Sequence, residues 1–419
     1  MTRPLTNWAG NIRYCAHAFE QPTSITELQG LVATSGHARV LGSGHSFNRI
    51  ADTAGTLVSL DRMPRELEID SPRMRVRVSA NWLLGDLCER LHRRGLALHN
   101  LPSLPHISVA GACATATHGS GTSHASLAGA VQALALVTAD GTRMELAAGD
   151  EDFDGAVVSL GALGVMTYLD LAVRPAYDIE QYVYEELPWT DLIASAGEIL
   201  SSAYSVSIFT NWTDCAQIWV KRRTDDELPD LAWLNAVKAD GPRHPVAGMC
   251  AANCTDQLGR PGPWHERLPH FRAGTEPATG NELQTEYFVP ADLTTKALHQ
   301  LKELRPLLAP VLQTSEIRTV AADTAWLSPT HGRNSTAIHF TWRPEEEAVR
   351  AVLPHVEDVL APLAARPHWA KIFMASPRKI RTLYDHWWDF SRLRHTYDPR
   401  GKFHNPFTTA LFTASDDDR

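Results

Sequence analysis

A loop of small residues that contains one histidine lies near the beginning of the chain. Residues 41–47 read Leu-Gly-Ser-Gly-His-Ser-Phe and follow a short strand-like run at 38–40. Glycine lets a backbone approach a ligand closely, and amide N–H groups together with two serine hydroxyls supply the donors that a phosphate requires. The loop therefore predicts an anion-binding turn beside His45. A Rossmann fingerprint would need glycine in place of Phe47, so a different nucleotide-binding fold is expected.

A second segment of small and hydrogen-bonding residues covers 103–121 and contains no acidic residue and no lysine. A flexible surface linker is the alternative interpretation. Ile107, Val109 and the many alanines argue against it, because apolar side chains are poorly suited to a solvated linker. Together, the two segments offer enough donors for the pyrophosphate of a dinucleotide.

Polar side chains two residues apart recur in the second half of the chain. Glu316 and Arg318 would share one face of a strand, as would His339 and Thr341. Lys371 lies between Trp369 and Phe373, which predicts a third strand. Each pair alone is more typical of an ordinary ion pair or cross-strand contact. Three such polar faces in one part of the chain favour a substrate pocket.

Two other classes of protein compete with this interpretation. A zinc hydrolase is suggested by His265, Glu266 and His270, but these histidines are five residues apart and Pro269 interrupts any helix. We expect no metal site, and we expect residues 261–271 to form a rigid loop rather than a site. A redox-inactive sugar-binding protein would not need His45 in a phosphate-binding turn.

Composition limits the remaining possibilities. The chain of 419 residues is longer than a usual domain with one hydrophobic core. Its contents of 44% hydrophobic and 21% charged residues are typical of a globular protein. A net charge of −9 without a basic block gives no support to nucleic-acid binding. No membrane-spanning run and no signal peptide is evident, so we expect a cytoplasmic monomer without a membrane partner. The six scattered cysteines are expected to be free thiols.

The sequence patterns around these residues predict both helices and strands, so we expect the first lobe to have the α+β class. A capping box at residues 24–27 begins a helix, alternation at 74–78 predicts a strand, and periodicity at 84–91 predicts another helix. Strands at 131–137 and 143–146 would be joined by a turn at Asp140 and Gly141, with a further strand near 166–173. A long helix is expected at 294–308. These patterns divide the chain into domains at 1–175 and 176–370 and a C-terminal segment at 371–419.

The motifs together resemble one family of flavoproteins. Residues 42–46, 108–121, 160–165, 263–271, 368–371 and 401–403 are similar to those of the vanillyl-alcohol-oxidase-type superfamily, and within it to the alditol (xylitol) oxidases. The sugar-lactone oxidases share several of these motifs. The resemblance implies a two-lobed FAD-binding domain of the VAO/PCMH type. It also implies a substrate-binding domain with an antiparallel sheet flanked by helices, and a C-terminal segment that returns to the flavin region.

The resemblance also implies a role for each site residue. FAD would be attached covalently through an imidazole nitrogen of His45 to the 8α carbon of the flavin. The implied cofactor-binding residues are Gly42, Ser43, Gly44, His45, Ser46, Phe47, Ser103, Ser108, Gly111, Thr115, Ala116, Thr117, His118, Val165 and His368. The implied substrate-binding residues are Ser103, Glu316, Arg318, Thr341 and Lys371, and the implied catalytic residues are Lys371, Arg318, Glu316 and His339.

The implied reaction is oxidation of the terminal hydroxyl of a small polyol such as xylitol or sorbitol to the aldose. Molecular oxygen would be reduced to hydrogen peroxide. Arg318 and Lys371 would stabilise negative charge on the substrate oxygen, and Lys371 would relay the hydroxyl proton. A sugar-1,4-lactone (aldonolactone) oxidase is the alternative.

Overall fold

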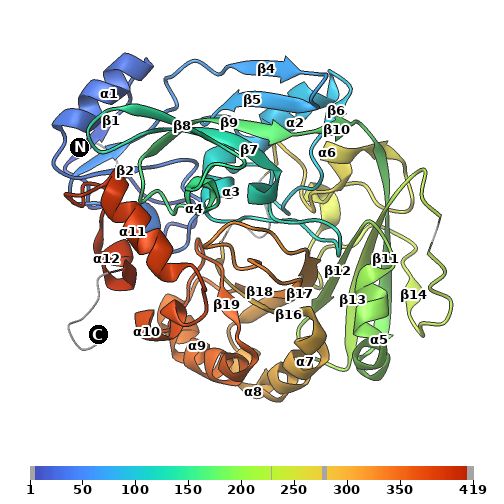
Figure 1. Ribbon diagram of the computed structural model, residues 1–419. Helices are drawn as coiled ribbons and strands as arrows, with labels where there is room; N and C mark the ends of the chain where they lie inside the picture. Colours follow the sequence, from blue (N-terminus) through green and yellow to red (C-terminus); the bar gives the residue numbers. More distant parts are fainter. Residues whose placement is uncertain (1–4, 228, 276–280, 413–419) are drawn as a thin grey trace.

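Two groups of β-sheets face each other across the middle of the molecule (Figure 1). The computed structural model describes residues 5–227, 229–275 and 281–412. The proposed domain boundary near residue 175 falls between the last strand of the upper group, β10 (Arg174–Pro175), and the first of the lower group, β11 (Asp178–Pro188). We call residues up to 175 the N-terminal region and residues 176–370 the second region.

The first sheet is small and parallel, in the order β1 (Ala18–Glu20), β3 (Thr56–Val58), β2 (Ala38–Val40). Helix α1 (Ile25–Thr34) precedes β2, and the hydroxyl of Ser24 accepts a hydrogen bond from the backbone N–H of Glu27, as the capping box predicted. β2 leads directly into the histidine loop, so the position of that loop is fixed by a buried strand.

A five-stranded antiparallel sheet forms most of the N-terminal region. Its order is β4 (Leu67–Asp70), β5 (Arg75–Ser79), β9 (Val165–Ala172), β7 (Val131–Val137), β8 (Arg143–Ala147). The predicted hairpin between β7 and β8 is confirmed, and so is α2 (Leu84–His92). The short helices α3 (Val109–Ala114) and α4 (Phe153–Val157) pack their apolar residues into one cluster with this sheet. α3 thereby anchors the second small-residue segment to the core.

The second region is built on a nine-stranded sheet. The path is β14 (Val237–Lys238), β11, β13 (Cys215–Arg223), β12 (Ser205–Thr210), β17 (Leu312–Val320), β18 (Ser335–Trp342), β16 (Leu283–Pro290), β19 (Arg366–Pro367), with β15 (Gly262–Pro263) paired to β11. All of these pairs are antiparallel. The expected α+β class with an antiparallel sheet flanked by helices is confirmed.

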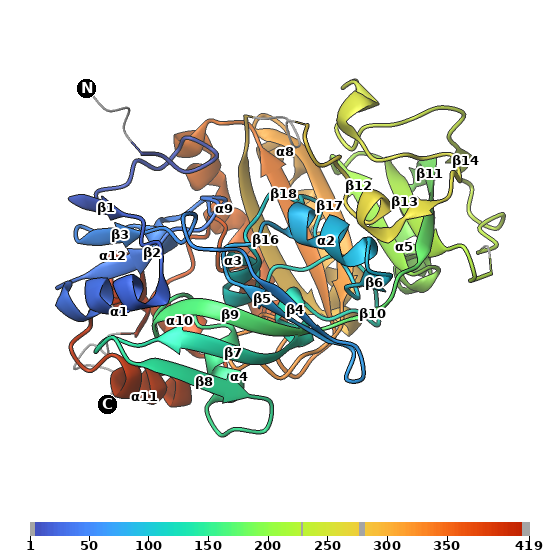
Figure 2. The same cartoon turned by 90° about the horizontal axis from the view of Figure 1, so that it is seen from above.

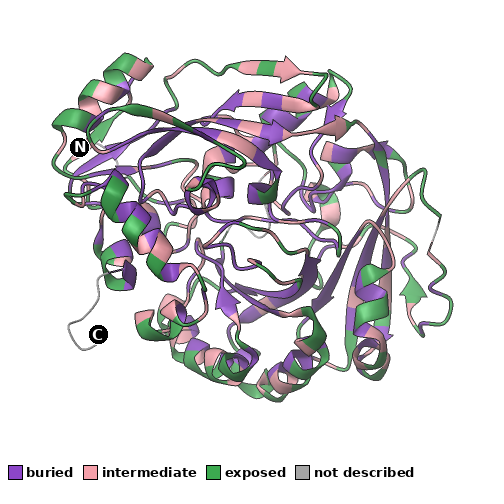
Figure 3. Cartoon of the chain, in the orientation of Figure 1, coloured by how far each residue is buried: buried purple, intermediate pink, exposed green. Residues whose placement is uncertain are grey.

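Four helices of the second region cover one face of the nine-stranded sheet. α5 (Trp189–Ser201), α7 (Thr294–Glu303), α8 (Arg305–Leu308) and α9 (Glu346–Leu360) pack on the face away from the N-terminal region (Figure 1). Their outer sides are exposed, whereas the central strands β12, β17, β18 and β16 are buried (Figure 3). The helix expected at 294–308 is in fact two helices, because the chain breaks at Leu304 ahead of Pro306. The other face of the sheet turns toward the N-terminal region, whose helix α2 lies in front of it in the view from above (Figure 2). Residues of that face and of the histidine loop line the same cavity.

The C-terminal segment returns to the N-terminal region. Helices α10 (Pro377–Arg381), α11 (Trp387–Tyr397) and α12 (Pro406–Phe412) follow the second region. The amide of Asn405 donates to the backbone carbonyls of Arg49, Ile50 and Asp52, and the backbone N–H of Ala38 donates to the backbone carbonyl of Lys402. Residues 402–405 are therefore bound next to the loop that carries His45.

The remaining elements are short. Strand β6 (Leu96–Ala97) pairs with β10, and α6 (Trp264–Arg267) is a single turn of helix. Single turns of 3₁₀ helix lie at Arg49–Ala51, Leu127–Ala130, Ala251–Asn253, Ala291–Leu293 and Ala361–Leu363.

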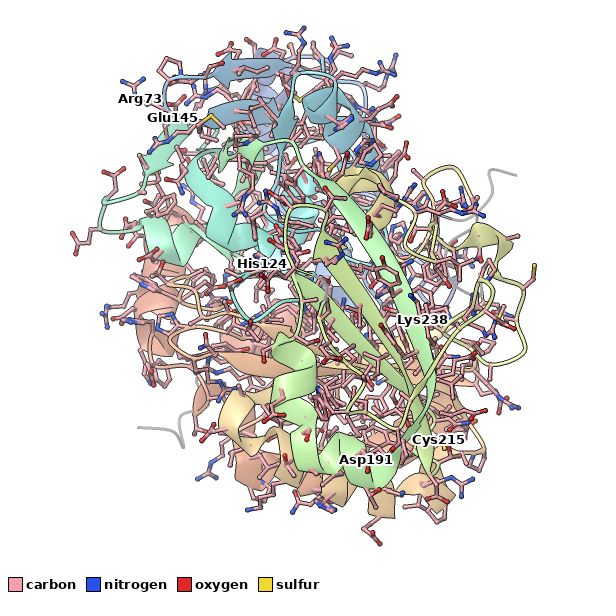
Figure 4. All side chains as sticks on the ribbon, turned by 90° about the vertical axis from the view of Figure 1, so that its right-hand side faces the viewer. Arg73, His124, Glu145, Asp191, Cys215 and Lys238 are labelled. Atoms are coloured by element: carbon pink, nitrogen blue, oxygen red, sulfur yellow. The ribbon has the colours of Figure 1, made fainter. Side chains whose placement is uncertain are left out.

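The six cysteines are free, as expected, and Cys215 is exposed at the start of β13 (Figure 4). None of the helices in the described part of the chain has the length and apolar character that crossing a bilayer requires.

Candidate active site

One cavity lies between the N-terminal region and the open face of the nine-stranded sheet. Its wall combines the histidine loop, the second small-residue segment and side chains of β16, β17 and β18. Of the twenty residues predicted for the site, these line the cavity: Gly42, Ser43, Gly44, His45, Ser46, Phe47, Ser103, Ser108, Gly111, Thr115, Thr117, His118, Glu316, Arg318, His339, Thr341, His368 and Lys371.

Two predicted cofactor-binding residues do not line the cavity. Ala116 is almost fully buried in the large hydrophobic cluster of the N-terminal region. Val165 is completely buried with Leu28 and Val32 beneath α1. The sequence pattern placed these residues in the correct segments but could not show which way each side chain points.

The histidine loop holds an imidazole that is neutral and has one nitrogen without a protein partner. Nδ1 of His45 lies 3.2 Å from the carbonyl of Ser43, and the ring stacks on Trp8 with centroids 5.2 Å apart. Burial lowers the pKa of His45 to about 4, so the ring is neutral near pH 7. Among the described residues, its buried Nε2 has no hydrogen-bond partner. A proton on Nδ1 leaves the lone pair of Nε2 for a bound group.

The two small-residue segments form one continuous cradle. The backbone N–H of Ser108 donates to the hydroxyl of Ser43 at 3.2 Å. A Cβ atom on Gly42 would lie only 2.3 Å from the hydroxyl oxygen of Ser108, so a larger residue would displace that hydroxyl from the cradle. Gly44 has φ of +71°, which also favours glycine. The close approach, the donors and the unpartnered imidazole nitrogen fit the dinucleotide FAD that the sequence motifs imply.

Lys371 lies in a turn after β19, so the prediction that it belongs to a strand is wrong. The backbone of this turn is bound by the histidine loop. The N–H of Phe47 donates to the carbonyl of Ala370 at 2.7 Å, and the amide of Asn48 donates to the carbonyls of Trp369 and Lys371 at 2.7 and 2.8 Å. The loop that carries His45 and the turn that carries Lys371 are thus joined directly.

A row of three polar side chains crosses the middle of the nine-stranded sheet. Glu316 on β17 is paired with His339 on β18, which is paired in turn with Glu286 on β16. Because side chains alternate along a strand, their neighbours Ile317, Ile338 and Tyr287 point to the opposite face, where they pack with the helices. The predicted shared faces of Glu316 with Arg318 and of His339 with Thr341 are therefore correct.

Glu286 is the centre of the charge network, and the sequence analysis missed it. The carboxylate is 1% exposed. One oxygen lies 2.7 Å from Nη2 of Arg318 and 3.3 Å from Nε2 of His118, and the other lies 3.0 Å from Nζ of Lys371. Burial alone would raise the pKa of Glu286, but Lys371, His118 and Arg318 hold it well below its usual range. Glu286 is therefore an ionised carboxylate between two cations.

Lys371 and His339 are joined by a hydrogen bond of 2.7 Å between Nζ and Nδ1. A lysine ammonium only donates, so Nδ1 of His339 accepts and Nε2 donates to the hydroxyl of Thr341 at 3.2 Å. Burial lowers the pKa of Lys371, and burial together with Lys371 lowers the pKa of His339 to about 4. The two groups can exchange a proton directly, next to the hydroxyl of Thr341.

Two further contacts complete the floor of the cavity. Nη1 of Arg318 donates to the hydroxyl of Ser103 at 3.2 Å, which connects the sheet to the cradle. Nε2 of His270 lies 2.7 Å from Oε1 of Glu316. His270 belongs to residues 261–271, which were expected to form a rigid loop rather than a site. In the structure His270 lines the cavity, which differs from that expectation. The only sequence signal was a histidine beside a proline, which does not distinguish a site from a loop.

The ligand atoms of His118, Glu286 and His368 lie within 4.8 Å of one another, close enough to suggest a metal site. Arg318 and Lys371 already contact the carboxylate of Glu286. A divalent cation there would face two positive charges at short range, which opposes binding. This cluster is better explained as part of the charge network.

Comparisons with known proteins agree with this architecture. A model of the "FAD binding domain" family matches residues 16–147, and one of the "D-arabinono-1,4-lactone oxidase" family matches residues 280–411. An alditol oxidase of Streptomyces sp. is 47% identical, over 98% of this chain and 99% of that protein. An L-gulono-1,4-lactone dehydrogenase of Mycobacterium tuberculosis is 28% identical over 96% and 97%. The crystal structure of cholesterol oxidase from B. sterolicum has a similar fold, with a TM-score of 0.80 at 14% identity over 98% of this chain and 96% of that one.

The paired sheets, the cradle between them and these matches define an FAD-binding flavoprotein of the vanillyl-alcohol-oxidase type. The fold alone does not separate its members, because a sterol enzyme shares it. At 47% identity over nearly the full length of both proteins, the chain belongs to the alditol oxidase family.

Proposed function

We propose that the protein oxidises the terminal primary hydroxyl of an alditol to an aldehyde, with FAD as cofactor and oxygen as the final electron acceptor. The observation that carries this proposal is the charge-balanced polar floor of the cavity. Glu286 and Glu316 are matched by Arg318 and Lys371, all four buried or nearly so. A floor without net charge, rich in both donors and acceptors, suits an uncharged polyhydroxylated substrate.

The same floor argues against an apolar substrate. The likeness to cholesterol oxidase concerns the fold, whereas a sterol would leave Glu316, Arg318 and His339 buried without new partners. Polar side chains that lose water and gain no new hydrogen bond are costly to bury, so such a ligand would bind poorly. Hydroxyl groups of a polyol can instead replace water on each of these side chains.

In the proposed mechanism, each residue either binds the polyol or handles its proton. The hydroxyls of Ser103 and Thr341 and the carboxylate of Glu316 bind and orient the substrate. Arg318, which stays protonated, stabilises negative charge that develops on the reacting oxygen. Lys371 in its neutral form takes the hydroxyl proton, and the adjacent His339 and Glu286 stabilise the resulting ammonium.

The cofactor would be held by the cradle formed from residues 42–47 and 103–118, with a covalent bond to Nε2 of His45. The neutral ring and the unpartnered nitrogen support this attachment. When bound, FAD would supply a two-electron acceptor for the hydride of the carbinol carbon, with oxygen as the final acceptor and hydrogen peroxide as the product. The turn at residues 369–371 keeps the proton-accepting group next to the same loop.

An aldonolactone oxidase is the second candidate. It is favoured by the lactone-oxidase family model, because the matched residues 280–411 include Glu286, Glu316, Arg318, His339 and Lys371. A lactone also presents several hydroxyls to the same floor. The distinction must come from activity.

The test is peroxide release by the purified yellow protein with xylitol, sorbitol and a galactonolactone. Peroxide formed with the alditols, at a higher kcat/KM than with the lactone, supports the proposal. A clear preference for the lactone would establish the second candidate instead. A protein that binds no FAD would contradict both.

A further inference from the structure

A buried lysine lies just behind the substrate-binding carboxylate. Lys221 is on β13, the strand that begins at Cys215 in Figure 4, and it is 1% exposed. In the described part of the chain it forms no ion pair with a carboxylate. Its ammonium instead contacts the carbonyls of Leu268 and Pro269 and Nδ1 of His270, the last at 3.1 Å. The three N–H groups of the ammonium therefore face three acceptors, so each acceptor can take one hydrogen bond.

We propose that Lys221 is a positioning residue that fixes one tautomer of His270 and thereby keeps Glu316 as the acceptor for a substrate hydroxyl. This inference rests on the proposed oxidation of alditols. Below about pH 7 Lys221 is an ammonium, and its contact then requires a lone pair on Nδ1 of His270, because an ammonium cannot accept a hydrogen bond. The ring proton must then be on Nε2, which donates to Oε1 of Glu316 at 2.7 Å.

The ring of His270 is held so that this chain of contacts cannot easily rearrange. Phe209 and Trp219 pack edge-on against it, each with ring centroids 5.3 Å away. Burial lowers the pKa of His270 to about 4, so the ring is neutral and its tautomer matters. His270 and Nε of Arg318 both approach Oε1 of Glu316, at 2.7 and 3.5 Å. The second oxygen of Glu316 remains for the substrate.

The titratable groups around this unit come from several elements. Glu316 and Arg318 face it from β17 and His339 from β18, and the thiol of Cys254 faces Lys221 from the loop before α6. Burial lowers the pKa of Lys221 to about 7, and Glu316 opposes that shift. The donors around Glu316 keep the pKa of its carboxyl below the usual range despite burial.

Loss of the donor at Nδ1 would free the ring to adopt either tautomer. In the form protonated on Nδ1, the lone pair of Nε2 would face a lone pair of Glu316 Oε1 across 2.7 Å. A proton between the two atoms removes that repulsion, so Glu316 would protonate at higher pH. A protonated Glu316 accepts hydrogen bonds less well, and substrate binding weakens.

The first experiment compares the Lys221→Met holoenzyme with wild type, using xylitol. Methionine keeps most of the volume and removes the donor. We expect KM to rise about tenfold while kcat changes little, and the acidic limb of 1/KM against pH to move up by about one unit, since a factor of ten and one pKa unit correspond to the same free energy. The limb of 1/KM follows binding by the carboxylate of Glu316, whereas the limb of kcat follows the proton acceptor Lys371. Lys402→Met is the matched control, because Lys402 is also buried and donates to the carbonyls of Val32 and Ala33, outside the cavity. It should leave both readouts unchanged.

A second variant separates positioning from a general loss of structure. In His270→Gln the side-chain amide donates to Glu316 whatever occupies position 221. Adding Lys221→Met in that background should therefore change neither KM nor the pH profile further. Equal effects of Lys221→Met in both backgrounds would overturn the inference, and so would an unchanged pH profile in an active Lys221→Met enzyme.

A measurement on wild type does not depend on any variant's activity. Nitrogen-15 NMR of histidine-labelled holoenzyme below pH 7, where Lys221 is an ammonium, should show the proton of His270 on Nε2, with His270 assigned by the signal missing in His270→Gln. A proton on Nδ1 would overturn the inference. If wild type oxidises no alditol, the proposed function has failed, and this tautomer measurement alone decides the role of Lys221.

Discussion

Glu286→Gln is the substitution that most directly tests the charge network. Glutamine keeps the shape of the side chain but removes the charge that lies 3.0 Å from Nζ of Lys371. At an effective dielectric constant of about 20, two unit charges at that distance attract by about 5.5 kcal/mol, equivalent to about four pKa units. We take this value as an upper limit and expect the pKa of Lys371 to fall by about two to four units.

The direction of the pH effect follows from the proposed role of Lys371. A proton acceptor must be neutral, so the rate of flavin reduction should rise with pH through the pKa of Lys371. Burial lowers that pKa and Glu286 raises it. Without Glu286 the rising limb should therefore move to lower pH. Breaking a buried ion pair costs about 3–5 kcal/mol, so the midpoint of thermal unfolding should also fall.

The assay is anaerobic stopped-flow reduction of the bound flavin by xylitol as a function of pH. Glu180→Gln is the matched control, because Glu180 is also buried in the sheet and ion-paired, to Arg222 at 2.7 Å, but does not line the cavity. It should lower stability without moving the limb. The reasoning is refuted if the limb stays in place in Glu286→Gln, or if both variants move it equally.

Three further predictions follow from other contacts. In His45→Ala, acid precipitation should leave the yellow colour in the supernatant, whereas wild type should retain it in the pellet; colour in the variant's pellet would contradict attachment through His45. Lys371→Met should slow flavin reduction by about 10²–10⁴-fold, the usual contribution of a general base, and an unchanged rate would exclude the proposed proton transfer. Asn48→Ala removes the two hydrogen bonds to the turn at residues 369–371, so the free energy of unfolding should fall by about 1–3 kcal/mol in denaturation experiments. Flavin reduction should slow in the same variant, and an unchanged rate would show that the turn positions Lys371 without Asn48.

Local patterns in the sequence were sufficient to predict much of the fold and of the cavity wall. Alternation placed Glu316 with Arg318 and His339 with Thr341 on common faces, since the side-chain period of a strand is fixed. Glu286 was missed although it also alternates, with Gln284 on its side of β16 and Glu282 just before the strand begins. Its importance depends on β16 lying next to β18, and strand order is not encoded in a local pattern.

Lys371 shows the opposite error. Trp369 and Phe373 alternate around it as they would in a strand, but their segment forms no ladder. Its carbonyl groups are bound by Phe47 and Asn48, residues more than 300 positions earlier. A contact at that separation is invisible to periodicity. The sequence motif therefore identified the residue, and only the tertiary structure showed how it is held.

The row of Glu316, His339 and Glu286 also ties activity to correct strand pairing. If β18 slipped by a single residue against its neighbours, Ile338 would enter the cavity and His339 would be forced among the apolar side chains under α7 and α9. A misaligned sheet would therefore lose the whole row at once rather than one contact. Insertions or deletions of one residue within β16, β17 or β18 should abolish turnover, so peroxide production directly reports the fraction of molecules whose strands are correctly aligned.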